Sequence, residues 1–299
     1  GSISAQGAAY IFNNITEKYN LANSTLAQTS SALSSQDGLP HALAFNSNGT
    51  KMYMAGDTNN RVYQYSLSTA YDLSTISYDS VSLDISSQVT NVWGIRWNND
   101  GTKLFLVCRG YNDVVQYDLS TAYDISTASY NNVKFATDSQ DTSPSGLFFK
   151  PDGTKMYLVG YQNDRVYQYS LSTGYDLSTV SYDNVSFDVS SEDNTPDEVE
   201  FTPDGTRMFI LGDANNSIYQ YTLSTAFDLS TASYDSVSVS SGVDGSPRQI
   251  VFDNDGSNYF IIGRGDDKVR KFQVAGWLQT VKLLAADGTT SDAFSGDIN

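Results

Sequence analysis

The residues best suited to chemistry in this sequence lie in four short segments. They are His41, Trp93, Arg96, Asp197, Glu198, Glu200 and Arg248. Neighbouring carboxylates can divide the roles of general acid and general base, and an indole ring flanked by hydrogen-bonding groups can bind a small polar ligand. The same charged residues could instead form ion pairs with a purely structural role.

Most templates of known catalytic sites are absent. His41 is the single histidine, and the sequence contains no Gly-x-Ser-x-Gly elbow, phosphate loop or His-Glu-x-x-His motif. A glycosidase needs two carboxylates on opposite sides of its substrate, whereas Asp197, Glu198 and Glu200 belong to one expected strand. We therefore predict no catalytic residues, no metal and no cofactor, and keep a carbohydrate-active hydrolase as the alternative.

A repeat of about 52 residues must position these side chains. Its marker is a turn dipeptide, found at Asn48-Gly49, Asp100-Gly101, Asp152-Gly153, Asp204-Gly205 and Asp255-Gly256. Each copy reads as four short antiparallel strands separated by turn residues, which is the pattern of one propeller blade. The sequence thus predicts an all-β, five-bladed β-propeller over residues 15–274.

Strand alternation assigns the candidate residues to the centre of this ring. An apolar series along the innermost strand is expected between blades: Leu43, Ile95, Leu147, Val199 and Ile250. The positions around it vary from copy to copy, so we expect them to face a central channel. Arg96, Glu198 and Glu200 then lie near the axis. At a channel mouth, Trp93 would stack against a ligand held by His41, Asp197 and Arg248.

The chain ends predict how the ring closes. The last repeat supplies three strands, and residues 24–36 resemble the fourth strand of the other copies. We expect this N-terminal segment to complete the fifth blade and so remove an exposed sheet edge. Residues 1–14 and 275–299 would then be flanking strands or linkers.

Composition excludes several classes of partner. The chain has 34 acidic and 17 basic residues and a net charge of −17, which disfavours nucleic acid and anionic membranes. No apolar run is long enough to insert into a membrane, and one cysteine permits no internal disulfide. The partners that we expect are a glycan, a cell-surface receptor, or other copies or domains of a larger assembly.

Two resemblances add a setting. Residues 149–157, Phe-Lys-Pro-Asp-Gly-Thr-Lys-Met-Tyr, and the phrase at 62–75 resemble repeats of marine phage tail or fibre proteins and of secreted bacterial β-propellers. Residues 7–12 and 277–288 resemble the two strands of an FG-GAP (integrin-type) repeat. Residues 287–292 lack the alternating carboxylates of a calcium loop.

Two aromatic residues in hairpin tips, Tyr111 and Tyr161, are further candidates, because an exposed ring can stack on a sugar. With the resemblances, these features predict a non-enzymatic structural and binding module. It would be a phage fibre or surface adhesin that recognises a glycan or host surface, located outside the cell or on a virion.

Overall fold

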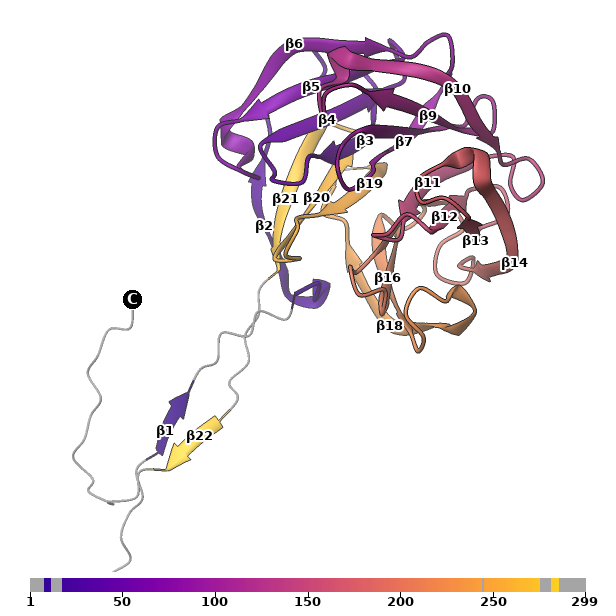
Figure 1. The fold of residues 1–299 in the computed structure, drawn as a ribbon. Coiled ribbons are helices and arrows are strands. Elements are labelled where there is room, and N and C mark those ends of the chain that lie inside the picture. Colours follow the sequence, from indigo (N-terminus) through magenta and orange to yellow (C-terminus); the bar gives the residue numbers. More distant parts are fainter. Residues whose placement is uncertain (1–7, 12–17, 244, 275–280, 285–299) are drawn as a thin grey trace, which may run out of the picture.

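The computed structural model describes residues 8–11, 18–243, 245–274 and 281–284. It confirms the all-β, five-bladed β-propeller, with four antiparallel strands in each blade (Figure 1). The innermost strands of neighbouring blades contact one another all the way around the ring. A two-stranded sheet forms separately where β1 (Ala8–Ile11) pairs antiparallel with β22 (Val281–Leu284).

The first four blades follow one another along the chain, and within each of them every strand pairs with the next one in sequence. Blade 1 consists of β3 (Pro40–Phe45), β4 (Lys51–Gly56), β5 (Arg61–Leu67) and β6 (Ile76–Asp84). Blade 2 consists of β7 (Val92–Trp97), β8 (Lys103–Cys108), β9 (Asp113–Leu119) and β10 (Ala128–Ala136). Blade 3 consists of β11 (Pro144–Phe149), β12 (Lys155–Gly160), β13 (Arg165–Leu171) and β14 (Val180–Asp188). Blade 4 consists of β15 (Pro196–Phe201), β16 (Arg207–Gly212), β17 (Ser217–Leu223) and β18 (Ala232–Ser240).

Blade 5 joins the two ends of the chain. It consists of β19 (Pro247–Phe252), β20 (Asn258–Gly263), β21 (Lys268–Val274) and, from the N-terminal segment, β2 (Ser24–Thr29). The predicted closure is therefore confirmed, although the strand is shorter than residues 24–36. The strand β2 ends at Thr29, and beyond it the backbone N–H of Leu33 donates to the Asp267 carbonyl over 2.7 Å. Leu33 is buried in an apolar cluster between blades 5 and 1.

The repeated turn is built around a tightly packed glycine. In blade 3, Gly153 has φ of +72°, and a Cβ atom there would lie 2.2 Å from the Tyr175 ring. The Asp152 carboxylate accepts a hydrogen bond of 2.9 Å from the Thr154 N–H. Since glycine alone combines this backbone conformation with so close a ring, each copy keeps it.

Neighbouring blades are joined by hydrogen bonds as well as apolar packing. A 3₁₀ helix precedes the outer strand of every blade, at Leu21–Asn23, Leu73–Thr75, Ile125–Thr127, Leu177–Thr179 and Leu229–Thr231. The side-chain Oε1 of Gln168 in blade 3 accepts a hydrogen bond of 2.9 Å from the Leu229 N–H of blade 4. The side-chain Oε1 of Gln28 in blade 5 accepts a hydrogen bond of the same length from the Leu73 N–H of blade 1. The ring is thus continuous through polar as well as apolar contacts.

The predicted facing of the inner strands also holds. Leu43, Ile95, Leu147, Val199 and Ile250 are fully buried, and each belongs to a different one of the five apolar clusters. The positions on either side of this series therefore face the channel.

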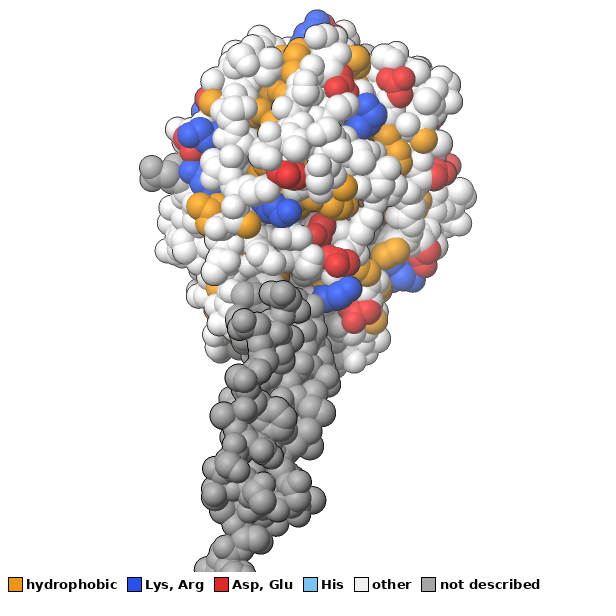
Figure 2. Space-filling model, turned by 90° about the vertical axis from the view of Figure 1, so that its left-hand side faces the viewer, with side chains coloured by type: hydrophobic (Ala, Val, Ile, Leu, Met, Phe, Trp, Pro, Cys, Tyr) orange, Lys and Arg blue, Asp and Glu red, His pale blue; other side chains and the backbone are white. Residues whose placement is uncertain are grey.

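Acidic side chains are scattered over the face of the molecule shown in Figure 2. No helix in the described part of the chain is long and apolar enough to span a membrane.

Closure by the N-terminal segment predicts a contrast between two of its leucines. Leu33→Ala removes a buried side chain and should lower the free energy of unfolding by about 2–5 kcal/mol. Leu26→Ala, at a position 54% exposed on β2, should change it by less than about 0.5 kcal/mol. Urea denaturation followed by circular dichroism measures both. Equal stability of the two variants would show that the segment does not pack as part of the ring.

Candidate functional site

The structure separates the seven candidate residues along the channel. Arg96 and Glu200 lie at a pocket at one end, which we call the Glu200 pocket. His41, Trp93, Asp197 and Arg248 lie together at the other end, which we call the His41 mouth. Glu198 is fully buried between them. The sequence predicted that all seven lie at the channel, with Arg96, Glu198 and Glu200 near the axis and the other four at a mouth. It did not predict that Arg96 and Glu200 lie at the opposite end from that mouth.

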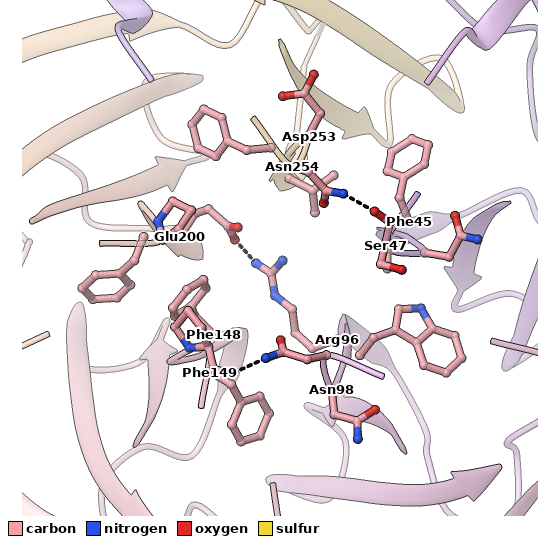
Figure 3. Close-up of a pocket in the computed structure, with 18 of the residues that line it drawn as sticks. Phe45, Ser47, Arg96, Asn98, Phe148, Phe149, Glu200, Asp253 and Asn254 are labelled. Atoms are coloured by element: carbon pink, nitrogen blue, oxygen red, sulfur yellow. Dashed lines mark hydrogen bonds and ion pairs between the residues drawn. The ribbon is translucent and has the colours of Figure 1, made fainter. Parts of the chain in front are cut away.

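The Glu200 pocket has a volume of about 310 Å³ and is lined by all five inner strands and the turns that follow them. Figure 3 shows Arg96 reaching across it, with its guanidinium directed at the Glu200 carboxylate. Arg96 comes from β7 of blade 2 and Glu200 from β15 of blade 4, so the ion pair passes over blade 3. Both side chains keep a little solvent access, 12% and 10% respectively, through the pocket.

Blade 3 and Glu198 hold the Arg96 side chain in this direction. Its Nε donates to the Leu147 carbonyl of β11, and its Nη2 lies 3.3 Å from the Glu198 carboxylate. The same Glu198 oxygen accepts bonds of 3.1 and 3.0 Å from the Leu147 and Val199 N–H groups. A guanidinium with this many acceptors has little freedom to turn.

Gln249 extends this polar network to the remaining blades. Its side-chain Oε1 accepts a hydrogen bond of 2.8 Å from the Leu43 N–H of blade 1, and its Nε2 donates over 3.2 Å to the Ile95 carbonyl of blade 2. Together, Arg96, Glu198 and Gln249 link all five blades at the axis. We call these three side chains the axial network; it separates the Glu200 pocket from the His41 mouth.

Burial sets the protonation of the acids in the channel. It raises the pKa of Glu200 to about 7, although the Arg96 charge opposes the shift. Burial likewise raises the pKa of Glu198 to about 8, again against Arg96 and with a further increase from Glu200. One guanidinium faces two carboxyls here. A proton is therefore retained in this cluster near neutral pH, and Glu200 is poised to gain or lose one.

Aromatic rings form the walls of the Glu200 pocket, and amides lie among them. The rings include Phe45, Trp97, Phe148, Phe149, Phe201 and Phe252. The amides are Asn46, Asn98, Asn99 and Asn254, of which Asn99 and Asn254 donate to the carbonyls of Pro151 and Ser47. An adjoining hollow of about 430 Å³ shares Tyr19, Pro203 and Asn254 with the pocket and adds Lys18 and Arg207. Apolar walls with a few polar groups suit a small organic ligand.

The His41 mouth brings together the four residues expected at one ligand site. Arg248 forms ion pairs of 2.8 Å with Asp197 and 3.1 Å with Asp213, and its guanidinium lies 4.8 Å from the Trp93 ring centroid. The His41 ring meets Trp93 edge to face at 5.0 Å. Burial raises the pKa of Asp197 to about 8, while burial and nearby arginines lower that of His41 to about 3.

Arg109 is a member of this mouth that sequence reasoning missed. Its guanidinium lies 4.0 Å from the Trp93 centroid and 4.2 Å from that of Tyr161. Tyr161 is therefore half-buried against Arg109, unlike the exposed ring that the sequence predicted, whereas Tyr111 is 52% exposed as expected. The available signal was repeat position, because Asp57, Arg109, Tyr161, Asp213 and Arg264 occupy equivalent sites.

Among the residues described, no group of three or more His, Cys, Asp or Glu side chains could hold a metal ion. The calcium-loop positions 287–292 of the FG-GAP resemblance lie outside the described residues. The role of the seven candidates in ligand binding stays a prediction.

The raised pKa values of Glu198 and Glu200 predict that the stability of the protein falls as pH rises. Between about pH 5 and 8 the folded protein retains protons that the unfolded chain has released, so alkaline pH favours unfolding. Glu198→Gln cannot ionise. Its free energy of unfolding, relative to that of the wild type, should therefore rise by roughly 1–3 kcal/mol between pH 5 and pH 9, as measured by urea denaturation. Glu192→Gln is the control, because Glu192 is partly exposed, and its free energy of unfolding should change with pH as that of the wild type does. If the free energy of unfolding of both variants depended on pH in the same way, the retained proton on Glu198 would be contradicted.

Comparison with solved structures finds chains of low sequence identity to this one. A functionally unknown protein from Desulfotomaculum acetoxidans superimposes with a TM-score of 0.50 and 14% identity, over 82% of this chain and 75% of that one. At this identity the likeness concerns the fold alone. A periplasmic gluconolactonase from Pseudomonas aeruginosa gives a TM-score of 0.47 and 16% identity, covering 83% of this chain and 71% of that one. No curated protein sequence matches the chain.

A family match corrects the functional expectation. Residues 95–291 match the family described as "Lactonase, 7-bladed beta-propeller". This finding overturns the prediction of a non-enzymatic protein, and with it those of a phage tail fibre, virion component and adhesin, because the family is one of enzymes. The ring here has five blades where the family description gives seven. The chain belongs to the lactonase family of β-propellers.

Proposed function

We propose that this protein is a hydrolase that opens cyclic esters in the Glu200 pocket. One observation carries the proposal above all others: Glu200, with its pKa raised to about 7 by burial, is ion-paired with Arg96 at a pocket of about 310 Å³. The family match supports the reaction class. The same acid was part of the alternative hydrolase predicted from the sequence, where it was grouped with Asp197 and Glu198.

The reaction needs a base for water and a positive group for the developing oxyanion. Ionised Glu200 takes a proton from a water molecule, whose oxygen attacks the carbonyl carbon of the lactone. The carbonyl oxygen becomes an oxyanion, which the Arg96 guanidinium stabilises. When the ring C–O bond breaks, Glu200 returns the proton to the departing alkoxide. The product is one hydroxy acid, and the carboxyl is again ready to accept a proton.

The axial network matters to this chemistry because it determines where Arg96 points. Arg96 is held from behind by the Leu147 carbonyl and by Glu198, so its charge is already in place when substrate arrives. A fixed dipole or charge stabilises a transition state without first reorganising. Glu198 itself has no exposed surface and does not reach the pocket, so we assign it a positioning role only.

The walls of the pocket favour a lactone of moderate size with both apolar and hydroxylated faces. Phe148 lies beside the guanidinium, 6.0 Å from ring centroid to Cζ, and with Phe45 and Phe149 offers flat apolar surface to a ring. Asn46, Asn98 and Asp253 supply hydrogen-bonding groups to the same pocket. Such a mixture suits the alternating C–H and O–H surfaces of a sugar lactone.

The proposal predicts that hydrolysis depends on Glu200. D-glucono-δ-lactone and γ-butyrolactone are suitable probes, since one is hydroxylated and the other is not, and acid release can be followed by pH-stat. Glu200→Gln removes the base and should lower kcat/KM at least about 100-fold. For the wild type, kcat/KM should rise with pH through about 7, because Glu200 is active when ionised.

Glu192→Gln provides the matched control. Glu192 lies outside the residues that line the pocket and accepts a hydrogen bond of 3.1 Å from the Tyr221 hydroxyl. This variant should keep wild-type kcat/KM. Full activity in Glu200→Gln would place the reaction elsewhere. No turnover of either lactone by the wild type would contradict the proposed activity on these substrates.

A further inference from the structure

The His41 mouth is built from two repeat positions, one on the inner strand and one at the tip of the next hairpin. The first contributes His41, Trp93, Ser145, Asp197 and Arg248, and the second Asp57, Arg109, Tyr161, Asp213 and Arg264. Every blade thus adds two side chains to this end of the channel. None of the ten lines the Glu200 pocket, which lies beyond the axial network.

Two arginines at this mouth lack an acidic partner in a protein rich in acids. The chain has 34 acidic residues against 17 basic ones. Arg61, Arg165 and Arg270, like Arg96 and Arg248, each pair with a carboxylate within 4.0 Å. Among the residues described, Arg109 and Arg264 form no such ion pair. Arg109 instead lies between the Trp93 and Tyr161 rings, and Arg264 is exposed.

The Nε2 atom of His41 is a hydrogen-bond acceptor within the His41 mouth. Its Nδ1 lies 3.1 Å from the Val92 carbonyl, which can only accept, so Nδ1 carries the hydrogen and Nε2 carries a lone pair. His41 is 2% exposed, and Nε2 has no hydrogen-bond partner. Arg248 Nε and Asp197 Oδ1 are buried and unpartnered in the same cluster. Buried polar atoms are rarely left unsatisfied, so three at one place indicate a ligand or water molecules.

These groups call for a ligand that carries both a negative charge and a hydroxyl group. Arg248, Arg264 and Arg109 all act electrostatically on His41. Arg248 is already paired with Asp197 and Asp213, so Arg109 and Arg264 are the guanidinium groups that an anion beside this ring meets without an acidic partner. A bare anion would leave the Nε2 lone pair unsatisfied. A hydroxyl on the same molecule can donate to it, and Trp93 offers an apolar face nearby.

We propose that the His41 mouth is a second binding site, for a hydroxycarboxylate anion. Its carboxylate lies among Arg109, Arg248 and Arg264, and a hydroxyl group donates to His41 Nε2. Opening a lactone yields a molecule of this class. The site would therefore sense the product of the reaction, an interpretation that rests on the proposed function although the binding itself does not.

The experiment measures binding of sodium D-gluconate by isothermal titration calorimetry. The Glu200→Gln variant is used throughout, so that no catalysis in the pocket contributes to the measured heat. Gluconate should bind, while acetate, which lacks the hydroxyl, and glucose, which lacks the charge, should each bind at least about tenfold more weakly. Equal binding of all three, or no binding of gluconate, would overturn the proposal.

Variants then locate the site. Arg109→Gln and Arg264→Gln should each weaken gluconate binding at least about fivefold. Arg264 is exposed, so its variant remains informative even if Arg109→Gln proves less stable. Arg207→Gln is the matched control, because Arg207 lines the hollow beside the Glu200 pocket and should leave the affinity within twofold. Loss of binding in Arg207→Gln alone would place gluconate at the opposite end and refute the second site.

This outcome is independent of the proposed hydrolase activity. If gluconate binds at the His41 mouth and neither lactone is hydrolysed, the binding site stands and the product interpretation falls. If the lactones are hydrolysed and gluconate does not bind, the activity stands and the second site falls.

Discussion

Closure of the ring is the constraint on which the other features of this structure depend. A propeller blade left with three strands exposes a row of unpaired backbone groups, and β2 covers that edge by pairing with β21. With blade 5 complete, its inner strand contacts those of blades 4 and 1, so five inner strands surround one axis. Equivalent repeat positions then converge at the centre, although they are about 52 residues apart in sequence.

A narrow axis explains why single side chains can bridge the ring. Arg96 reaches from blade 2 to blade 4, and Gln249 from blade 5 to blades 1 and 2. Burying a guanidinium is costly unless it is paired and hydrogen-bonded, and here two carboxyls and a backbone carbonyl satisfy it. Burial raises the pKa values of both Glu198 and Glu200, and the single Arg96 charge offsets the two shifts only in part.

The axial network also gives the protein two chemically different ends. On one side the inner strands lead to a pocket with aromatic walls, where Glu200 and Arg96 are partly accessible. On the other side arginines, acids and His41 crowd around Trp93. The family match supports the proposed hydrolase activity, and the raised pKa of Glu200 favours the end of the channel at which this base lies. The two ends are formed by five blades here, whereas the family description gives seven.

The sequence by itself determined the blade, the number of copies and the closure. A turn such as Asp152-Gly153 followed by alternating residues encodes a local hairpin, and local patterns are legible because they depend on neighbours in the chain. Alternation also showed that Leu147 packs between blades and that Arg96 and Glu200 face the channel. The tertiary structure alone decided that Asp197 and Glu200, three residues apart, serve opposite ends, and that Arg109 joins Trp93. Those contacts depend on distances across the ring, which a repeat position does not specify, because they are set by how far each side chain extends from its own blade.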